Sequence, residues 1–344
     1  MTLTLNFFGL NLVNPIVRSK FGGMYESFFA GLVKHKCQII YSDQIPANNA
    51  DILIVPMGGG QDYSSLWAMR RFAGPVVLYV PPANQWFDRQ LLTRCRPKIL
   101  FAYGTDASTL SPSLYSQIGI SYFYFPFGSD PQVMKPLDIP RQYDVVFVGS
   151  LEHAPRRILF FESLMKQIGS RNLLCVGTGW QKYGIPNQLV TWGSLLNVIY
   201  NLGKVCVNVH TDTQILGQEK QLDLNNRVFD LAMAGCCQVC DNPDAVRFCF
   251  DDDEIVATND PKEWAKRVIH LVDDSQSAER LRQKVFLRAH RDHMWSHRAK
   301  EFLGYILTRL PRWQPVSAAI LQPSLGMLLT EVKRQTKRMI DWRA

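Results

Sequence analysis

Residues 125–150 read FPFGSDPQVMKPLDIPRQYDVVFVGS, and this stretch divides the chain into two similar halves. Its first eighteen residues hold four prolines and a glycine, a composition that ends regular secondary structure and is typical of a linker. Its last eight residues form an apolar run of the kind found in buried parallel strands. The stretch therefore predicts the end of one domain and the beginning of another.

Short β-like runs alternate with helical segments on both sides of this linker. Before it, the expected strands are LTLNFFG, QIIYS, DILIVPM, PVVLYV, KILFAY and SYFYF, with helices at 24–34 and 64–72. After it, the expected strands are YDVVFVGS, NLLCVG, QLVTWG, KVCVNVH, CCQVCD and EIVAT, with helices at 156–168 and 226–234. Residues 261–310 are predicted to be helical, with an interruption at 275–277. Strands and helices that alternate in this way build doubly wound parallel sheets.

The length of 344 residues suits two domains at roughly 150 residues each. We therefore expect an α/β fold with two tandem Rossmann-like, doubly wound domains that face a central cleft. The predicted boundaries are 1–136 for the N-terminal domain, 137–310 for the C-terminal domain and 311–344 for a basic tail, which is expected to be helical.

The composition is that of a globular protein, with 47% hydrophobic and 20% charged residues. Cys236, Cys237 and Cys240 cluster in one apolar run, but no second ligand pair at the spacing of a zinc site accompanies them. The eight cysteines are expected to be buried free thiols in a reducing compartment. The N-terminus lacks the pattern of a signal peptide and no apolar run reaches 18 residues, so a cytoplasmic location is expected.

The net charge of +8 is concentrated near the C-terminus. Residues 281–344 hold 13 Lys and Arg against 4 Asp and Glu, whereas the first 280 residues hold 25 against 26. This region either faces an anionic surface, such as the inner face of a membrane or a nucleic acid, or is a solvated helical face. Its last part, EVKRQTKRMIDWR, either lies on a lipid interface as an amphipathic helix or packs back on the protein.

Glycines and arginines at the starts of two helices indicate anion binding. Gly22 and Gly23 open one helix, where they either let backbone N–H groups approach an acceptor or phosphate group or form a tight turn. Arg156 and Arg157 follow FVGS at the start of another helix, where a cation is unfavourable unless an anion such as a diphosphate lies beside it. One of these two arginines is expected to be only a surface residue. The glycines of GTG (177–179) and MGGGQ (57–61) do not complete a dinucleotide fingerprint, so a nicotinamide-dependent dehydrogenase is not favoured.

The run LNNRVFDLAMAGCCQVCD, residues 224–241, carries two charges inside an apolar segment. Asn225 or Asn226 is the expected N-cap of a short helix, and Gly235 is expected just beyond its end. Arg227 and Asp230 share one face of this helix. They form either a surface pair or part of the cleft, where Asp230 would accept hydrogen bonds from a ribose and Arg227 would hold phosphate.

Several of these segments, in this order and spacing, resemble nucleotide-sugar-dependent glycosyltransferases of the GT-B fold. The segments are FPFGSDPQVMKP, FVGSLEHAPRR, TWGSLLNVIYNLGKVCVNVH and NNRVFDLAMAGCCQVCD. The sequence is most similar to the spore-maturation (CgeB-like) glycosyltransferases, which are related to glycosyltransferase family 4. Residues from about 143 to 305 carry nearly all of the resemblance, and HMWSHRAKEFL looks like the closing helix of that family.

The resemblance implies a donor site for a nucleoside-diphosphate sugar in the C-terminal domain. The backbone near Trp192 and Gly193 would hold the base, and Asp230 stands where the family usually has a ribose-binding glutamate. The position eight residues earlier is Leu222, with Asp223 and Glu219 as the nearest acids, so the role of the family's second glutamate is unassigned. The full set of predicted donor-binding residues is Gly149, Arg156, Arg157, Gly177, Trp192, Gly193, Asn208, His210, Arg227, Asp230 and Glu254.

No metal or other cofactor is expected, because in GT-B enzymes of this kind cationic side chains and a helix dipole stabilise the departing nucleoside diphosphate. Two groups nevertheless suggest metal ligands: DDDE at 251–254, and the helically spaced His290, His293 and His297. An inverting reaction would need a general base from the N-terminal domain, for which Asp106 is the best-placed candidate, ahead of His35 and Asp43. A retaining course, as in family 4, would need no such base and is the one we expect.

The sequence thus predicts an enzyme that moves a hexose or pentose from a nucleoside-diphosphate sugar to a hydroxyl-bearing acceptor, without a metal. The acceptor is open: a glycan, a lipid-linked glycan, a protein or a nucleic acid. Three alternatives remain: a DNA-modifying glycosyltransferase that grips phosphates with its basic C-terminal region, a GT-B epimerase or binding module, and a membrane-surface enzyme acting on a lipid-linked acceptor.

Overall fold

A computed structural model describes most of the chain. The described residues are 2–9, 26–42, 46–56, 62–80, 92–93, 95–105, 110–152, 154–188, 193–210, 214–215, 219–220 and 223–313. The predicted residues Gly22, Gly23, Asp106 and Trp192 lie outside these ranges, as does the tail from residue 314 onward.

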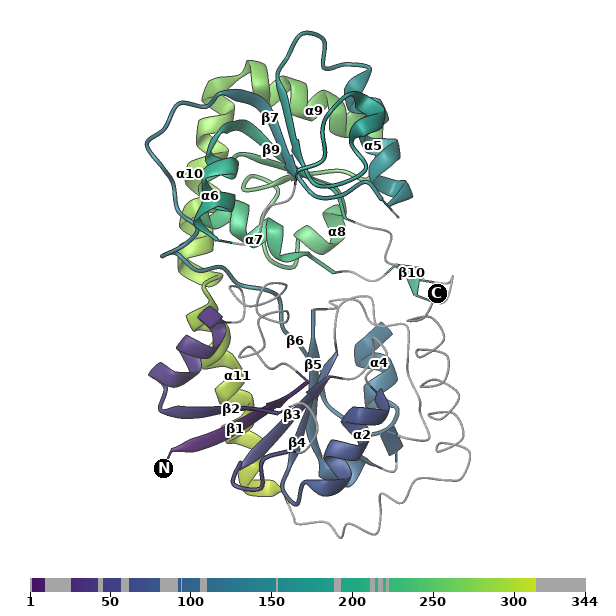
Figure 1. Cartoon of the computed structure of the whole chain (residues 1–344), viewed down its shortest axis with the longest axis vertical. Helices are drawn as coiled ribbons and strands as arrows, with labels where there is room; N and C mark the ends of the chain where they lie inside the picture. The colour runs from purple at the N-terminus through teal and green to yellow at the C-terminus, as the bar shows by residue number, and fades with distance from the viewer. Residues whose placement is uncertain are drawn as a thin grey trace.

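The first lobe is built on a six-stranded parallel sheet with the order β2-β1-β3-β4-β5-β6 (Figure 1). The strands are β1 (Leu3–Phe8), β2 (Cys37–Ser42), β3 (Ile52–Pro56), β4 (Val76–Val80), β5 (Ile99–Gly104) and β6 (Tyr122–Tyr124). Its helical elements include residues 26–34, α2 (Asp62–Arg71), the 3₁₀ turn η1 (Arg96–Lys98) and α4 (Leu110–Ser116). The expected strands of the first half are all present, because each is a short apolar run that this sheet buries.

The second lobe is built on a five-stranded parallel sheet with the order β13-β12-β9-β7-β8. The strands are β7 (Tyr143–Val148), β8 (Leu173–Val176), β9 (Gly203–Asn208), β12 (Gln238–Cys240) and β13 (Val256–Ala257). The helical elements are α5 (Pro155–Met165), η2 (Gln181–Tyr183), α6 (Ser194–Asn201), α7 (Asn226–Met233), α8 (Pro243–Val246), α9 (Pro261–Asp273) and α10 (Ser275–Asp292). A two-stranded ribbon joins β10 (Gln214–Ile215) to β11 (Glu219–Lys220). The predicted α/β fold with two doubly wound sheets is confirmed.

The order of the second sheet creates a switch point between β7 and β9. The chain passes from β7 to its neighbour β8 and then returns to β9 on the other side of β7. In doubly wound sheets the crevice at such a point, beyond the carboxyl ends of the strands, is where ligands bind. The loops that follow β7, β8, β9 and β12 are therefore the expected location of a ligand-binding site.

The helices after residue 260 differ from the expected pattern in two ways. Residues 275–277 were expected to interrupt a helix, but they form the first turn of α10, and the break falls at Asp274. The Asp274 carboxylate caps α10 by accepting hydrogen bonds from the backbone N–H (3.0 Å) and hydroxyl (2.6 Å) of Ser277. A second break at 293–294 separates α10 from α11 (Trp295–Arg309), which is followed by the 3₁₀ turn η3 (Leu310–Arg312).

Helix α11 belongs to the first lobe by its contacts. Phe302 is fully buried and packs edge-to-face on Phe28, Phe101, Tyr103 and Phe125, which all come from the first lobe. The predicted C-terminal domain ran to residue 310, but these contacts attach residues 295–309 to the first sheet. The chain therefore crosses between the lobes twice, once in the linker and once at 293–295.

The two crossings are hydrogen-bonded to each other. The backbone N–H of Ser129 donates to the carbonyl of His293 (2.9 Å), and the N–H of Trp295 donates to the carbonyl of Ser129 (3.1 Å). Arg298 of α11 donates to the carbonyls of Pro126 (3.0 Å) and Phe127 (3.3 Å). The joint between the lobes is thus a fixed backbone contact rather than a free linker.

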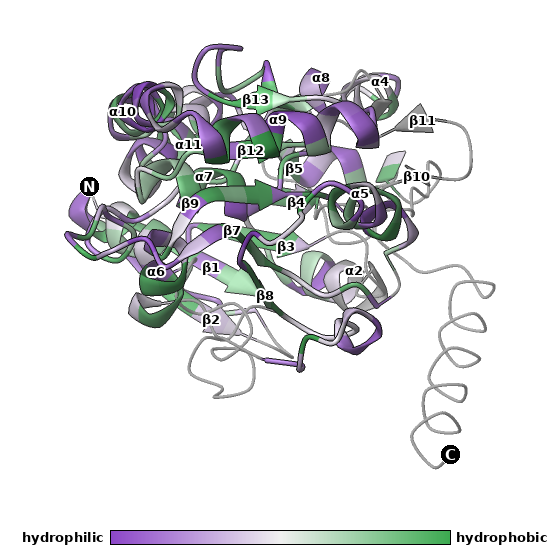
Figure 2. Ribbon diagram, turned by 90° about the horizontal axis from the view of Figure 1, so that it is seen from above, coloured by the Kyte–Doolittle hydropathy of each residue, from purple (hydrophilic) through white to green (hydrophobic). Residues whose placement is uncertain are grey.

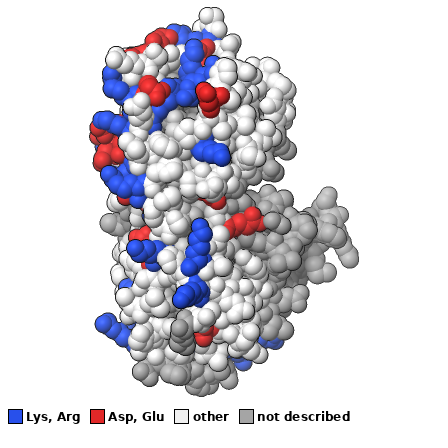
Figure 3. Space-filling model, turned by 90° about the vertical axis from the view of Figure 1, so that its left-hand side faces the viewer, with Lys and Arg blue, Asp and Glu red and all other residues white. Residues whose placement is uncertain are grey.

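Polar groups cover the outside of the second lobe. Figure 2 shows that α10 is largely hydrophilic. Cations and acids are interspersed on the face shown in Figure 3. The cations of α10 pair with acids: Lys284 with Asp253, and Arg288 with Asp292 (2.9 Å). These ion pairs offset part of the positive charge that the sequence gathers after residue 280.

The cysteines and the helices bear on two expectations about the whole chain. All eight cysteines are free and buried, as predicted. None of the described helices combines the length and the apolar character that crossing a membrane requires.

Candidate functional site

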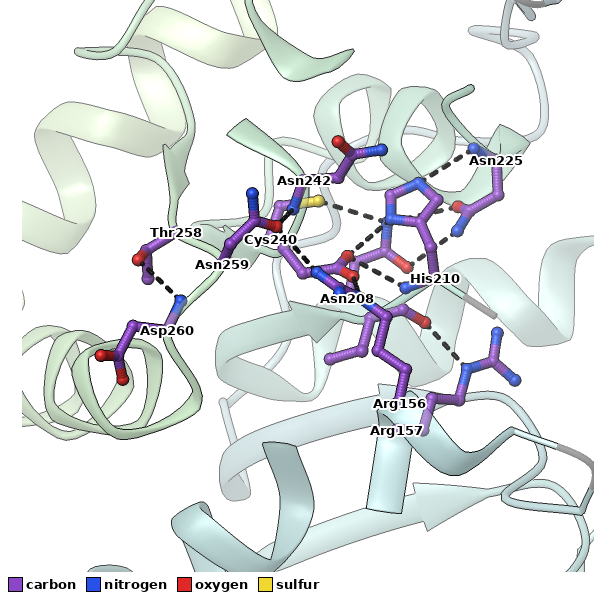
Figure 4. Close-up of polar contacts among 12 residues, drawn as sticks. Arg156, Arg157, Asn208, His210, Asn225, Cys240, Asn242, Thr258, Asn259 and Asp260 are labelled. Carbon is purple, nitrogen blue, oxygen red and sulfur yellow. Dashed lines mark hydrogen bonds and ion pairs between the residues drawn. The ribbon is translucent and has the colours of Figure 1, made fainter. Parts of the chain in front are cut away.

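Polar side chains from the start of α5, the end of β9, the start of α7 and the end of β12 gather at one edge of the sheet in the second lobe (Figure 4). Gly149 follows β7, Gly177 follows β8, Asn208 ends β9 and Asp241 follows β12. Because these strands are parallel neighbours, their carboxyl ends meet at the switch point. Helices α5 and α7 begin at the same edge.

Asp241 is the centre of a buried network. Its carboxylate accepts hydrogen bonds from the His210 ring (Nδ1, 2.6 Å), the His210 backbone N–H (2.9 Å) and Arg156 Nε (2.7 Å). Burial alone would raise the pKa of Asp241, but His210 and Arg156 outweigh it and lower the pKa to about 2. Asp241 is therefore a carboxylate, and its charge compensates that of Arg156.

Both ring nitrogens of His210 have a partner. Nδ1 lies against the Asp241 carboxylate, and Nε2 accepts a hydrogen bond from the backbone N–H of Asn225 (3.2 Å). The ring therefore contacts Asp241 through Nδ1 and Asn225 through Nε2. The histidine thereby joins the loop after β12 to the start of α7.

Asn208 connects the end of β9 to the same helix. Its side-chain amide exchanges two hydrogen bonds with the amide of Asn225, each of 3.2 Å, and its Oδ1 also accepts from Arg227 Nη1 (2.5 Å). Asn225 occupies the N-cap position of α7, as one of the two predicted alternatives, but its side chain makes no cap hydrogen bond. The first backbone N–H groups of α7 consequently have no side-chain cap.

Two guanidinium groups converge on the ring of Phe147 at the end of β7. The guanidinium carbon of Arg227 lies 5.2 Å from the ring centroid and that of Arg157 lies 5.6 Å from it. Arg157 is buried and donates to the carbonyls of Val209 (2.8 Å) and Ser150 (2.7 Å). Burial and the charge of Arg227 lower the pKa of Arg157 to about 9.

Neither of these two arginines forms an ion pair with a carboxylate within the described part of the chain. Arg156 differs, because it pairs with Asp241 and also donates to Asn259 (2.7 Å). The expectation that one member of the Arg156–Arg157 pair is only a surface residue is wrong, since both are tied into the network. Arg157 and Arg227 therefore have no carboxylate of the described residues in direct contact, and the more distant charges of Asp230 and Asp241 act on them.

The loops after β7 and β8 form a tightly packed wall beside these arginines. A Cβ on Gly177 would lie 2.3 Å from the carbonyl oxygen of Gly149, so no larger residue fits at position 177. A Cβ on Gly149 would lie 3.1 Å from Arg227 Nη2. Trp180 Nε1 donates to the Gly149 carbonyl (2.8 Å) and holds the two loops together. The glycines thus allow the backbone to come close to the arginines.

The starts of α5 and α7 add to the positive potential of this edge. In both helices the N-cap side chain makes no hydrogen bond to the first turn, and the first turn contains no acidic residue. Uncapped N–H groups and the helix dipole favour an anion at such a position. The site as a whole is suited to bind an anionic group with at least two negative oxygens.

Asp230 and Arg227 form hydrogen bonds with different parts of the molecule. The sequence left a surface pair and a position in the cleft as alternatives for both residues. The Asp230 carboxylate is buried and accepts hydrogen bonds from Ser129 Oγ (2.6 Å) and Asn226 Nδ2 (3.2 Å). Arg227 instead reaches the end of β9. The face that the two residues share on α7 therefore splits between the anion site and the joint of the lobes.

The remaining predicted residues lie outside the network. Gly193 is the N-cap of α6 with φ of +147°, and a Cβ there would have nothing within 4 Å. Glu254 accepts from the backbone N–H of Asp251 (2.9 Å) in the turn before β13, and burial raises its pKa. Of the expected strand QLVTWG, Gln188 forms an isolated bridge with Gly177, and residues 189–192 lie outside the described residues.

The metal-ligating groups suggested by the sequence do not converge. Asp251, Asp252 and Asp253 are exposed and each pairs with a different cation. His293 lies buried between α10 and α11, where burial and Arg298 lower its pKa to about 3, whereas His290 packs on Phe286. The acidic side chains of 251–253 and the histidines His290 and His293 therefore serve separate local contacts.

One group that the sequence did not suggest has metal-ligand atoms close together: His210, Cys240 and Asp241, whose atoms lie within 4.8 Å of one another. Nδ1 of His210 and both carboxylate oxygens of Asp241 are already engaged in hydrogen bonds. Burial raises the pKa of the Cys240 thiol well above its usual value, which opposes the thiolate that a metal needs. The residues fit a hydrogen-bonded network better than a metal centre.

Sequence reasoning missed Asp241, Asn225 as a side-chain partner, and Ser129. Asp241 directly follows the apolar run CCQVC, and a polar residue at the carboxyl end of a predicted parallel strand was a usable signal. Ser129 carried no such signal, because its partner Asp230 is 101 residues away in the chain.

The second half of the chain matches a known family. Residues 156–304 match a family model described as glycosyl transferase-like. A comparison with curated proteins finds no match.

Solved structures resemble the chain over nearly its whole length. Sucrose-phosphate synthase from Thermosynechococcus elongatus is 11% identical with a TM-score of 0.64, and the match covers 91% of this chain and 100% of that one. Anabaena HepE, solved with UDP and glucose, is 10% identical with a TM-score of 0.63, covering 89% and 100%. The chain has the GT-B fold. The DNA-modifying enzyme β-glucosyltransferase shares this GT-B fold at 11% identity and a TM-score of 0.56, covering 88% and 99%.

The family match falls mainly within the second lobe. The glycosyl transferase-like match begins at Arg156, the first arginine of the anion site, and includes α7, β12 and most of α11. The site described above therefore lies in the lobe that carries the family likeness. At 10–11% identity the structural likeness concerns the fold.

Proposed function

We propose that this GT-B chain transfers a sugar from a nucleoside-diphosphate sugar to a hydroxyl group of an acceptor. The observation that carries the proposal is the pair of guanidinium groups, Arg157 and Arg227, without a carboxylate partner in the described part of the chain. The family match of residues 156–304 and the UDP in the HepE structure support the same assignment.

The diphosphate of the donor would occupy the space between the two arginines and the first turns of α5 and α7. In the transfer, the acceptor oxygen forms a bond to the sugar C1, the bond between C1 and the diphosphate oxygen breaks, and the proton of the acceptor hydroxyl passes to the departing diphosphate. Negative charge grows on the nucleoside diphosphate as it departs. Fixed guanidinium groups and uncapped backbone N–H groups stabilise that charge without having to reorganise. This is why the proposal includes transfer without a metal ion.

The remaining polar residues would shape the donor pocket. Asp241 holds Arg156 and His210 in place, and Asn208 orients Arg227. Gly149 and Gly177 would let the diphosphate approach the backbone, since neither leaves room for a side chain. A retaining course is part of the proposal by resemblance to family 4; Asp106 is the candidate base for an inverting course. The proposal includes a hexosyl or a pentosyl group as the group transferred.

A thermal-shift screen with uridine, guanosine, thymidine and cytidine diphosphates tests the donor site. Ligand that binds only the folded state at one hundred times its Kd adds about 2.7 kcal/mol to the free energy of unfolding. We expect one of the four to raise the melting temperature and to do so equally with EDTA present. If none of the four shifts the melting temperature, the donor assignment is wrong.

A further inference from the structure

Ser129 stands where the two chain crossings and the donor helix meet. Its side chain is fully buried, and three hydrogen bonds hold the residue. The backbone N–H and carbonyl bond to His293 and Trp295 of the second crossing, and the hydroxyl donates to Asp230 of α7 at 2.6 Å. A Cβ on the preceding Gly128 would lie 3.0 Å from the backbone nitrogen of Trp295, which shows how closely the crossings approach.

Asp230 transmits this contact to the anion site. Its second oxygen accepts from Asn226 (3.2 Å), at the start of the same helix, so both carboxylate oxygens are fixed. Arg227 lies three residues before Asp230 on α7, and the Asp230 charge opposes the effect of burial on the pKa of Arg227. The carboxylate is thus linked electrostatically to a guanidinium of the donor site and sterically to the joint of the lobes.

We propose that Ser129 is a positioning residue of the donor site, whose hydroxyl fixes the Asp230 carboxylate and couples helix α7 to the joint between the lobes. This inference rests on the proposed function insofar as α7 carries a donor-binding arginine. Through the hydrogen bond, an anion bound at Arg227 stiffens the two crossings, and a loosened joint weakens the hold on the anion. Asp230 acts here as a link between the joint and the site.

Hydrogen exchange followed by mass spectrometry tests the link without any ligand. In the Ser129→Ala variant, the backbone amides of 226–233 and of 293–298 are expected to exchange at least several-fold faster than in the wild type. Ser163→Ala is the matched control, because the Ser163 hydroxyl bonds only to the carbonyl of Leu159 within α5 (3.1 Å). Exchange in Ser129→Ala that equals the wild type in both segments overturns the inference, whether or not a nucleotide binds.

A double-mutant cycle then tests whether Ser129 acts on binding through Asp230. With uridine diphosphate as the probe, Ser129→Ala and Asp230→Asn are each expected to raise Kd roughly three- to tenfold, and the double variant no further than the stronger single variant. Fully additive effects would mean that Ser129 acts independently of Asp230, and would overturn the inference.

The two experiments separate this inference from the proposed function. Faster exchange in Ser129→Ala together with no uridine diphosphate binding by the wild type supports the link and counts against uridine diphosphate as the ligand of the donor site. Normal nucleotide binding with unchanged exchange supports the donor site and rejects the link. The Ser129→Thr variant keeps the hydroxyl, so its amides should exchange as slowly as those of the wild type.

Discussion

Two guanidinium groups on one aromatic ring are costly for a folded protein unless something offsets their repulsion. The ring of Phe147 contacts both Arg157 and Arg227. Backbone carbonyls accept hydrogen bonds from Arg157, and Asn208 accepts one from Arg227. Cation–π contacts and neutral acceptors stabilise the charges in part, at about 0.5–2 kcal/mol each for the ring contacts. The remaining excess of positive charge is the feature that an anionic ligand would relieve.

Replacing Arg227 tests this excess at the level of one residue. Arg227→Gln is expected to raise the Kd for uridine diphosphate by roughly ten- to a hundredfold, because a hydrogen bond to a charged group contributes about 1.5–3 kcal/mol. Glutamine keeps an amide that can donate to Asn208, and the repulsion with Arg157 disappears, so stability should change little. Isothermal titration calorimetry measures the binding.

Arg267→Gln is the matched control for that experiment. Arg267 is exposed and pairs with Glu263 on α9 (2.7 Å), away from the site. Its replacement should leave the Kd unchanged. Equal affinities in wild type and Arg227→Gln would contradict the role assigned to Arg227.

The low pKa of Asp241 predicts how stability depends on pH. A carboxyl whose folded pKa of about 2 lies below its unfolded value of about 3.9 stabilises the protein above pH 3.9 and loses that contribution as the pH falls toward 2. About half of the contribution is lost by pH 3. The difference in the free energy of unfolding between wild type and Asp241→Asn should therefore shrink from pH 5 to pH 3.

Urea unfolding at pH 5, 4 and 3 measures that difference. At pH 5 the Asp241→Asn variant should be less stable by about 3–5 kcal/mol, because Arg156 loses its buried partner. A difference that stays constant over this pH range would show that Asp241 is not the carboxylate that the network requires.

Individual residues of the site could be predicted only where the signal was local. Arg156 and Arg157 stood out as cations at a helix start, whereas Asn208 and His210 entered the predicted donor set with the family resemblance. The partner of each could not be predicted, since Asp241 is 85 residues from Arg156 and Ser129 is 101 residues from Asp230. Such contacts depend on the order of strands in the sheet and on where the linker lies.

At the level of elements, apolar runs sufficed to predict nearly all of the strands. Element ends were harder, because they depend on hydrogen bonds that the pattern does not encode. The run CCQVCD was expected to form a strand throughout, but only Gln238–Cys240 pair with β9. Residues 275–277 appeared as a break because serines disfavour helix interiors, yet here they follow the Asp274 cap.

The end of α7 gives a prediction at this scale. Gly235 follows the C-cap Ala234 with φ of +64°, and a Cβ there would lie 3.0 Å from Pro136 Cγ of the linker. Gly235→Ala should lower the free energy of unfolding by more than the roughly 1 kcal/mol that the left-handed conformation costs an alanine. Chemical denaturation measures the change.

Gly184→Ala separates the two contributions. Gly184 has a similar φ of +73°, but a Cβ there would have nothing within 4 Å. Gly184→Ala should therefore lower the free energy of unfolding only by the cost of the left-handed conformation. If Gly235→Ala costs no more than Gly184→Ala, the contact between the helix end and the linker does not constrain the joint.

For the molecule as a whole, the two lobes share one hydrophobic cluster. It runs from the first sheet through Phe28 and Phe302 to Val228 and Phe229 of α7. The division into two Rossmann-like halves could be predicted from the linker and the repeated alternation. The return of α11 to the first lobe could not be predicted from periodicity, because the pattern of an amphipathic helix does not indicate which sheet the helix packs on.

Phe302 tests how much the first lobe depends on α11. Phe302→Ala should lower the free energy of unfolding by about 3–5 kcal/mol, the usual cost of removing a fully buried phenylalanine. Leu307→Ala on the same helix is the control, since Leu307 is 60% exposed, and should change it by less than about 0.5 kcal/mol. Similar effects of the two variants would mean that α11 is not part of the core.

The path of α11 also has a consequence for synthesis on the ribosome. The first lobe is translated first, but the helix that covers Phe28, Phe101 and Phe123 is made only after every strand of the second lobe has emerged. The second lobe can bury its own sheet while the aromatic face of the first lobe is still uncovered, because residues 295–309 have not yet been made. The order in which the lobes mature is thus the reverse of the order in which they are made.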